Sequence, residues 1–273
     1  MLTQPLPDLA RWVASFRDAE IPVFRATATS LAVLRAREDD TSPAEIAEVV
    51  QTDPLMTLRV LAFAGQHRSR RVVTDSETVT SSLVLMGVSP FFRSFGEPAT
   101  VEDLLGERTE ARAGLDAVLH RSFRASRFAL GFAVVRIDTD AEVLAEAALL
   151  HGFAEMLLWC HAPRLALEIA RRQREAPGLR SADAQRAVLG ITLADLQHGL
   201  MEAWRLPRML VDATDRRNFA DPRVRNVLLA VDLARHTQKG WDDPALGDDF
   251  RAIGELLRIA PEQARLRAIA LDA

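Results

Sequence analysis

Six histidines give this chain most of its chemical potential, because a neutral imidazole can bind a metal ion or exchange a proton near neutral pH. They are His67, His120, His151, His161, His198 and His236. His151 lies within the apolar segment 147–153. Two interpretations of it remain open: a buried histidine bonded to a backbone carbonyl, or a metal ligand.

Several common catalytic devices are missing from the sequence. Lys239, the only lysine, is followed by Gly240 and Trp241, so it belongs to no G-x-x-x-x-G-K-[ST] phosphate loop. Neither G-x-G-x-x-G nor G-x-S-x-G occurs. Cys160 is the single cysteine, which excludes a C-x-x-C zinc pair and an intrachain disulfide. We expect Cys160 to be a small buried hydrophobe in a reducing compartment.

The charge balance argues against a nucleic-acid partner. The chain carries 34 basic and 38 acidic residues, a net charge of −4, and its sequence pI is about 5.9. A nucleic-acid-binding domain is expected to show a positive balance or a basic stripe. The densest basic patch holds Arg68, Arg70 and Arg71, which are candidate anion-binding residues, although a plain exposed loop is the simpler explanation.

The elements that must position these residues are predicted to be helices. Ser42 and Glu45 form a capping box with Pro43 at the first helical position, and the segment 139–142 has a second such pattern. Asp53-Pro54 and Asp221-Pro222 indicate two further helix starts. Hairpin dipeptides and sustained alternation of apolar and polar residues are missing. The sequence therefore predicts a compact all-α fold with about a dozen helices.

Length and hydropathy favour a globular chain. It has 273 residues, of which 48% are hydrophobic, enough to bury a core. We expect no apolar run that approaches the roughly 18 residues of a membrane span. Residues 1–12 lack the basic and apolar regions of a signal peptide. We therefore expect a cytoplasmic protein without a membrane span.

Several short segments, taken in order, carry a family resemblance. They include residues 21–24 (IPVF), 51–55 (QTDPL), 147–152 (AALLHG) and 200–207 (LMEAWRLP). They resemble the HDOD family, the "HD-related output domain" of bacterial signalling proteins, whose motifs include "DP-x-L", "GLLHDIG" and "LL-x-x-W-x-LP". The resemblance implies an all-α HD-like fold. We expect an N-terminal helical extension at 1–19, an HDOD domain at 20–240 and C-terminal helices at 241–273 packed on it.

The wider HD superfamily, which this chain also resembles, contains metal-dependent phosphohydrolases whose metal ligands are a His, a His-Asp pair and a late Asp. By this resemblance His151 is the His of the pair, Gly152 replaces its Asp, Arg121 replaces the first His, and Asp232 is the counterpart of the late Asp. A guanidinium stays protonated and repels a cation. The resemblance thus implies a vestigial site, in which Arg121 is expected to pair with Asp232 or a nearby acid.

Three functions follow as hypotheses. The first is a catalytically inactive regulatory domain, not an enzyme, that acts through an unknown protein partner and needs no cofactor or metal. The second is a module that binds a small anion such as a nucleotide. The third is a residual metal-dependent phosphohydrolase with His151, Glu155 and Asp232 as ligands, provided that one continuous helix places Glu155 on the same face as His151.

Overall fold

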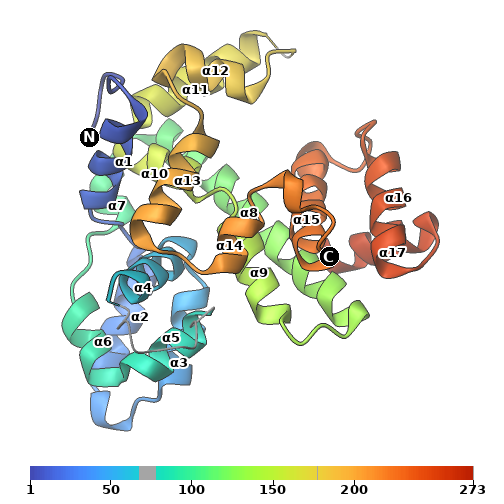
Figure 1. Ribbon diagram of the computed structural model, residues 1–273. Helices are drawn as coiled ribbons and strands as arrows, with labels where there is room; N and C mark the ends of the chain where they lie inside the picture. The colour runs from blue at the N-terminus through green and yellow to red at the C-terminus, as the bar shows by residue number, and fades with distance from the viewer. Residues whose placement is uncertain (68–77, 177, 273) are drawn as a thin grey trace. The chain divides into compact units, whose positions relative to one another are not determined.

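A computed structural model describes residues 1–67, 78–176 and 178–272, and within these ranges the regular elements are helices (Figure 1). One isolated parallel bridge joins Val23 to Thr100 in the same ranges. Here the Val23 amide donates to the Ala99 carbonyl at 2.9 Å, and the Val101 amide donates to the Val23 carbonyl at 2.8 Å. The all-α prediction is confirmed.

The chain divides into two compact units, each of which is built from two stretches of sequence. Unit 1 comprises Met1–Ala117 and Phe153–Pro207, and unit 2 comprises Val118–Gly152 and Arg208–Ala273. This division by compactness uses other boundaries than the expected segments 1–19, 20–240 and 241–273, which stay a prediction.

Unit 1 contains most of the helices. They are α1 (Leu9–Asp18), α2 (Arg25–Arg35), α3 (Pro43–Gln51), α4 (Pro54–His67), α5 (Val79–Met86), α6 (Val88–Phe95), α7 (Val101–Leu105), the start of α8 (Thr109–Arg136), α10 (Phe153–His161), α11 (Pro163–Glu175), α12 (Ser181–Leu189) and α13 (Leu193–Trp204). The Ser42 capping box at the start of α3 is present as expected. Asp53 caps α4, since its Oδ1 accepts from the amides of Leu55 and Met56 at 2.9 and 3.1 Å.

The first helix belongs to the core of unit 1, because α1 packs against α13. Trp12 is fully buried, and its indole N–H donates to the Leu189 carbonyl at 3.2 Å. Gly199 on α13 allows the close packing of α1, since a Cβ at this position would lie 2.5 Å from Cγ2 of Val13. Cys160 is buried as expected, and burial raises the pKa of its thiol to about 12, which makes the thiol chemically inert.

Unit 2 contains the rest of α8 from Val118, together with α9 (Ala141–Leu149), α14 (Arg208–Asp212), α15 (Pro222–His236), α16 (Leu246–Leu257) and α17 (Pro261–Asp272). Helix α15 packs against α9 and α16, and α17 packs against α16. Two short 3-10 turns flank α15, at Arg216–Asn218 and Thr237–Lys239.

The second predicted capping box is wrong. Helix α9 begins at Ala141 with Asp140 as its N-cap residue, and no side chain caps it there. The carboxylate of Asp140 instead accepts from the Arg223 guanidinium at 3.3 Å. The N-cap residue is therefore Asp140 and not the predicted Thr139, and its carboxylate binds an arginine far away in the sequence.

The expectation about apolar runs also needs correction. Within residues Ala141–His161 an 18-residue window has a mean hydropathy of 1.4, and by length and composition the stretch could cross a membrane. In the structure this stretch is two helices, α9 and α10, separated by a turn at residues 150–152. Because 72% of the apolar window is buried, the stretch has the character of core helices and is weak evidence for a span.

Candidate functional site

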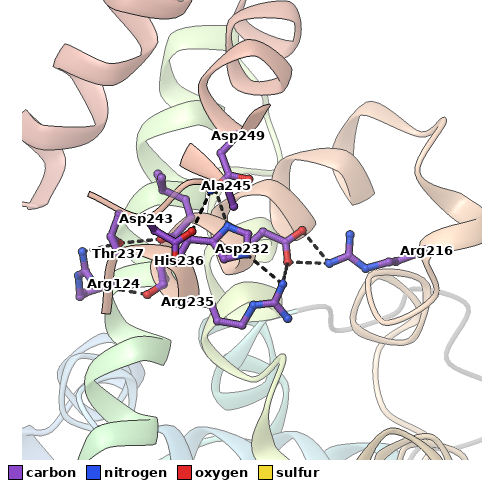
Figure 2. A network of polar contacts seen from close by, with 11 residues as sticks. Arg124, Arg216, Asp232, Arg235, His236, Thr237, Asp243, Ala245 and Asp249 are labelled. Carbon is purple, nitrogen blue, oxygen red and sulfur yellow. Dashed lines mark hydrogen bonds and ion pairs between the residues drawn. The ribbon is translucent and has the colours of Figure 1, made fainter. Parts of the chain in front are cut away.

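The carboxylate of Asp232 is the centre of a polar network in unit 2 (Figure 2). Asp232 lies on α15 and is 8% exposed. Nη2 of Arg216 donates to both of its carboxylate oxygens, at 2.6 and 2.7 Å, and Nη2 of Arg235 donates to Oδ1 at 3.1 Å. Two guanidinium groups therefore neutralise and occupy this carboxylate.

The charges of this network change the pKa of His151. It lies in the turn directly after α9, and its Nε2 atom is buried. Burial is the main reason that the pKa of His151 falls to about 4, and the positive charges of Arg216 and Arg235 lower it further, whereas Asp232 and a backbone hydrogen bond with Ala213 oppose the change. The imidazole is consequently neutral at physiological pH. The hydrogen bond with Ala213 agrees with the first interpretation of His151, a buried histidine bonded to a backbone carbonyl.

A second acid–base pair joins α15 to α16. Nδ1 of His236 lies 2.6 Å from Oδ2 of Asp249, a carboxylate that is only 8% exposed. Burial raises the pKa of Asp249, while the bond to His236 opposes this rise. Arg235 lies next to the pair, with its Nη2 3.3 Å from Nε2 of His236. The sequence analysis did not identify this pair, since His236 and Asp249 belong to no local pattern.

A third part of the network fixes the end of the chain. The guanidinium of Arg124, on α8, binds both carboxylate oxygens of Asp272, on α17, at 2.7 and 2.6 Å. It also donates to Oγ1 of Thr237 at 2.7 Å and to the Ala234 carbonyl at 3.3 Å (Figure 2). With 7% of its side chain exposed, Arg124 is a buried cation whose charge Asp272 balances.

The remaining predicted residues of unit 2 lie on α8 and in the turn after α9. Arg121 is half-buried on α8, between the exposed His120 and the buried Ser122. The guanidinium groups seen on Asp232 are those of Arg216 and Arg235, so the expected pairing with Arg121 stays a prediction. The spacing of Arg235, three residues after Asp232 on one helix, was the signal that could have pointed to it.

Gly152, which stands where the resemblance expects an Asp, is not required by packing. A Cβ built at Gly152 meets no atom within 4 Å, and the residue is not among the glycines with positive φ. The backbone at this point would accept an aspartate. The missing carboxylate is therefore a property of the sequence and not a constraint of the fold.

Two other expected contributions lack support or lie outside the structure. Glu155 was expected to share a helix face with His151 on one continuous helix, but α9 ends at Leu149 and α10 begins at Phe153. That condition is not met, because the turn interrupts the helical spacing. Arg68, Arg70 and Arg71 fall within residues 68–77, outside the described part of the chain.

The residues present do not fit the metal centre that the HD resemblance implies. In the ranges that the structure describes, no three His, Cys, Asp or Glu side chains gather in a way that could hold a metal ion. A cation at Asp232 would also meet the positive charges of Arg216 and Arg235. The neutral His151 is the member of the implied set whose chemistry still suits a metal.

Solved structures share the fold. The response regulator MmoQ from Methylococcus capsulatus str. Bath is similar with a TM-score of 0.61 and 22% sequence identity, over 87% of this chain and 98% of that chain. A virulence factor (cj0248) from Campylobacter jejuni subsp. jejuni is similar with a TM-score of 0.60 and 16% identity, over 94% of this chain and 92% of that one. No curated protein matches the sequence.

The family is decided by the sequence match. The profile of the HDOD domain matches residues 21–218, well over half of the chain, and includes His151, Gly152 and Arg216, while Asp232 lies beyond it. The helices and the order of the motifs agree with this match. The chain therefore belongs to the HDOD domain family.

Proposed function

We propose that this protein is a catalytically inactive HDOD domain that regulates bacterial signal transduction in the cytoplasm through contacts with a protein partner. The observation that carries the proposal is the Asp232 carboxylate, which Arg216 and Arg235 occupy together. A carboxylate bound in this way is a poor cation ligand, because a metal ion would have to displace two charge-assisted hydrogen-bonding partners. The missing side chain at Gly152 supports the same conclusion.

The comparisons support the signalling part of the proposal. HDOD is the family of the chain, and the similar MmoQ structure is named as that of a response regulator. The shared fold covers 98% of that protein's solved chain, which supports a regulatory role of the same kind.

The nucleotide-binding alternative has less support. Two arginines near the site are already engaged by acids, Arg216 by Asp232 and Arg217 by Asp215, the latter at 2.6 Å. An anionic ligand would have to compete with these carboxylates. It remains an outcome that the experiment below can reveal.

The test measures metal binding in the full chain, purified without metal-affinity resin or chelator. Metal content is determined by mass spectrometry, and thermal stability is followed while Mn²⁺, Fe²⁺ or Zn²⁺ is added. The proposal expects substoichiometric metal and no saturable shift for the wild type. Near-stoichiometric metal, or phosphodiesterase activity that His151→Ala abolishes, would overturn it in favour of a residual phosphohydrolase.

A matched pair of variants tests the role of the arginines. Arg216→Ala removes the cation with the two short bonds to Asp232, whereas Arg217→Ala removes a neighbouring, 90% exposed guanidinium that binds Asp215. If arginine occupancy weakens cation binding at Asp232, any metal affinity should appear or increase in the first variant and stay unchanged in the second. A nucleotide panel in the same thermal assay tests the anion-binding alternative.

A further inference from the structure

A row of exposed apolar side chains runs along α8 in unit 2. The exposed fractions are 37% for Phe123, 43% for Leu130, 63% for Val134 and 89% for Ile137. Their spacings of seven, four and three residues place them on one side of the helix, over roughly 21 Å. The core of the unit takes up other positions of the same helix, including the fully buried Phe128 and Phe132. We call these four residues the α8 stripe.

Ile137 is the most unusual member of the stripe. It follows the last residue of α8 with φ of 58°. Its amide donates to the Val134 carbonyl at 3.1 Å, and the Asp138 amide donates to the Ala133 carbonyl at 3.0 Å. This hydrogen-bond pattern is the Schellman motif, whose left-handed position is usually glycine.

A β-branched residue in the left-handed region is disfavoured by its own Cβ substituents. The other non-glycine residues with positive φ in the described chain are Arg205 and Arg258, neither of which branches at Cβ. The fold obtains little packing in return, since the Ile137 side chain is 89% exposed. A contact outside this chain would account for an isoleucine at such a position.

We propose that the α8 stripe is the interface of a homodimer, in which α8 of one copy packs antiparallel against α8 of a second copy with Leu130 at the two-fold axis. Phe123 and Ile137 each lie seven residues from Leu130, so the two-fold places Phe123 of each copy opposite Ile137 of the other. An isologous interface requires such a self-complementary surface. The proposal is independent of whether the HDOD site binds a metal.

The charges beside the stripe have the polarity that this pairing needs. His120 and Arg121 precede Phe123, and Asp138 and Asp140 follow Ile137. The two acids also contact basic residues of their own chain. Asp138 lies 3.2 Å from Arg136. Asp140, whose side chain is 39% exposed, lies 3.3 Å from Arg223. The antiparallel pairing brings the part of α8 that carries Arg121 in one copy near the turn with Asp138 and Asp140 that follows α8 in the other copy. Arg121 of one copy and the acids of the other therefore carry opposite charges at each end of the antiparallel pair, whereas a parallel pair would place like charges side by side.

The oligomeric state of the full chain is the first test, measured by sedimentation velocity over a wide concentration range. We expect a monomer–dimer equilibrium whose dissociation constant rises at least about tenfold in Val134→Asp, a loss of about 1.4 kcal/mol or more. Val33→Asp is the matched control, because Val33 on α2 is 61% exposed and lies outside the stripe. A monomer at every concentration, or an equal effect of both variants, would overturn the proposal.

Ile137→Gly separates the interface from the fold. Glycine relieves the left-handed backbone, so the melting temperature of the monomer should rise while the dimer weakens. A fall in both the melting temperature of the monomer and the strength of the dimer would indicate that Ile137 serves only the fold, and it would contradict the proposal.

The antiparallel register has its own test by disulfide cross-linking. Leu130→Cys should form a disulfide between two copies on mild oxidation, because it lies at the axis. Phe123→Cys should cross-link only when Ile137→Cys is also present. Cys160 is buried and should not interfere. Efficient cross-linking through Phe123→Cys alone, or binding of a monomer to anionic vesicles through the stripe, would instead identify another register or another occupant.

Discussion

Arg216 binds both carboxylate oxygens of Asp232, at 2.6 and 2.7 Å, although the two residues lie 16 positions apart in the sequence. The contact connects the 3-10 turn before α15 to the C-terminal part of that helix. It also places a positive charge where it lowers the pKa of the buried His151. Arg216 thus binds the carboxylate of Asp232 and helps to keep the imidazole of His151 neutral.

Replacing this arginine should change His151 more than it changes stability. Because the Arg216 side chain is 59% exposed, Arg216→Ala should lower the free energy of unfolding by only about 0.5–1 kcal/mol. The pKa of His151 should rise above its value of about 4, since one opposing cation is lost. A histidine NMR titration measures the pKa, with Arg217→Ala as the control. An unchanged His151 titration in Arg216→Ala would contradict the electrostatic coupling.

Stability should fall as the pH is lowered from about 6.5 to about 4. Burial lowers the pKa of His151 and of His161 to about 4, whereas an unfolded histidine titrates near 6.5. In this window the unfolded chain binds more protons than the folded chain, so protonation favours unfolding, by up to about 3 kcal/mol for each residue.

Urea unfolding at several pH values measures this loss. His151→Gln should reduce the dependence on pH by the share of one histidine. Replacement of His198, whose side chain is 58% exposed, controls for the loss of a surface imidazole. Stability that is constant between pH 6.5 and 4 in the wild type would show that neither buried histidine resists protonation.

Gly152→Asp should be tolerated. A Cβ at Gly152 meets nothing within 4 Å, and the residue directly precedes α10, where an aspartate can accept from the first helical amides. We expect a free energy of unfolding that is unchanged or higher by up to about 1 kcal/mol. The variant also restores the His-Asp pair of the resembled family, so its metal content shows whether the second carboxylate alone is sufficient.

Gly65→Ala provides the contrast for that measurement. Its Cβ would lie 2.3 Å from the Trp204 carbonyl oxygen and 2.5 Å from that of Arg205, and backbone atoms cannot move aside as a side chain can. We expect a loss of about 1–3 kcal/mol in chemical denaturation. Equal stability of the two glycine variants would contradict the close approach of α4 to the end of α13.

The contact between Arg124 and Asp272 should be the most costly ion pair to break. Asp272→Ala leaves a guanidinium that is 7% exposed without its carboxylate, and we expect a loss of about 3 kcal/mol in urea unfolding. Arg127→Ala is the control, because Arg127 is 51% exposed and lies 3.4 Å from the same acid. A similar, small effect of both variants would refute the structural role of Arg124.

The same pair predicts a loss of stability in acid. The hydrogen bond and charge of Arg124 lower the pKa of Asp272 below its usual value of 3.8. This contribution is therefore complete above the pKa of the unfolded carboxyl and is lost as the pH falls through the lower pKa of the folded state. In Asp272→Ala this part of the acid dependence should disappear.

The sequence by itself determined the local elements of this protein. The capping box of Ser42 and Glu45 and the Asp53 cap depend on contacts within three residues, so their patterns were sufficient to predict where α3 and α4 begin. The short motifs at 21–24, 51–55, 147–152 and 200–207, in their order, identified the resemblance to the HDOD family and the substitution at Gly152. The helix caps and the motifs each depend on residues that are close together in the sequence, so they can be predicted without knowing which distant segments meet.

Only the tertiary structure decided the partners of the charged residues. Asp140 contacts Arg223, 83 positions away, and Arg124 reaches Asp272 across 148 positions. Arg216, not an arginine predicted from the family motif, provides the short bonds to Asp232. A long, flexible charged side chain can reach several acids. The packing of the helices decides which of these acids lies close to it and is sufficiently buried to bind it.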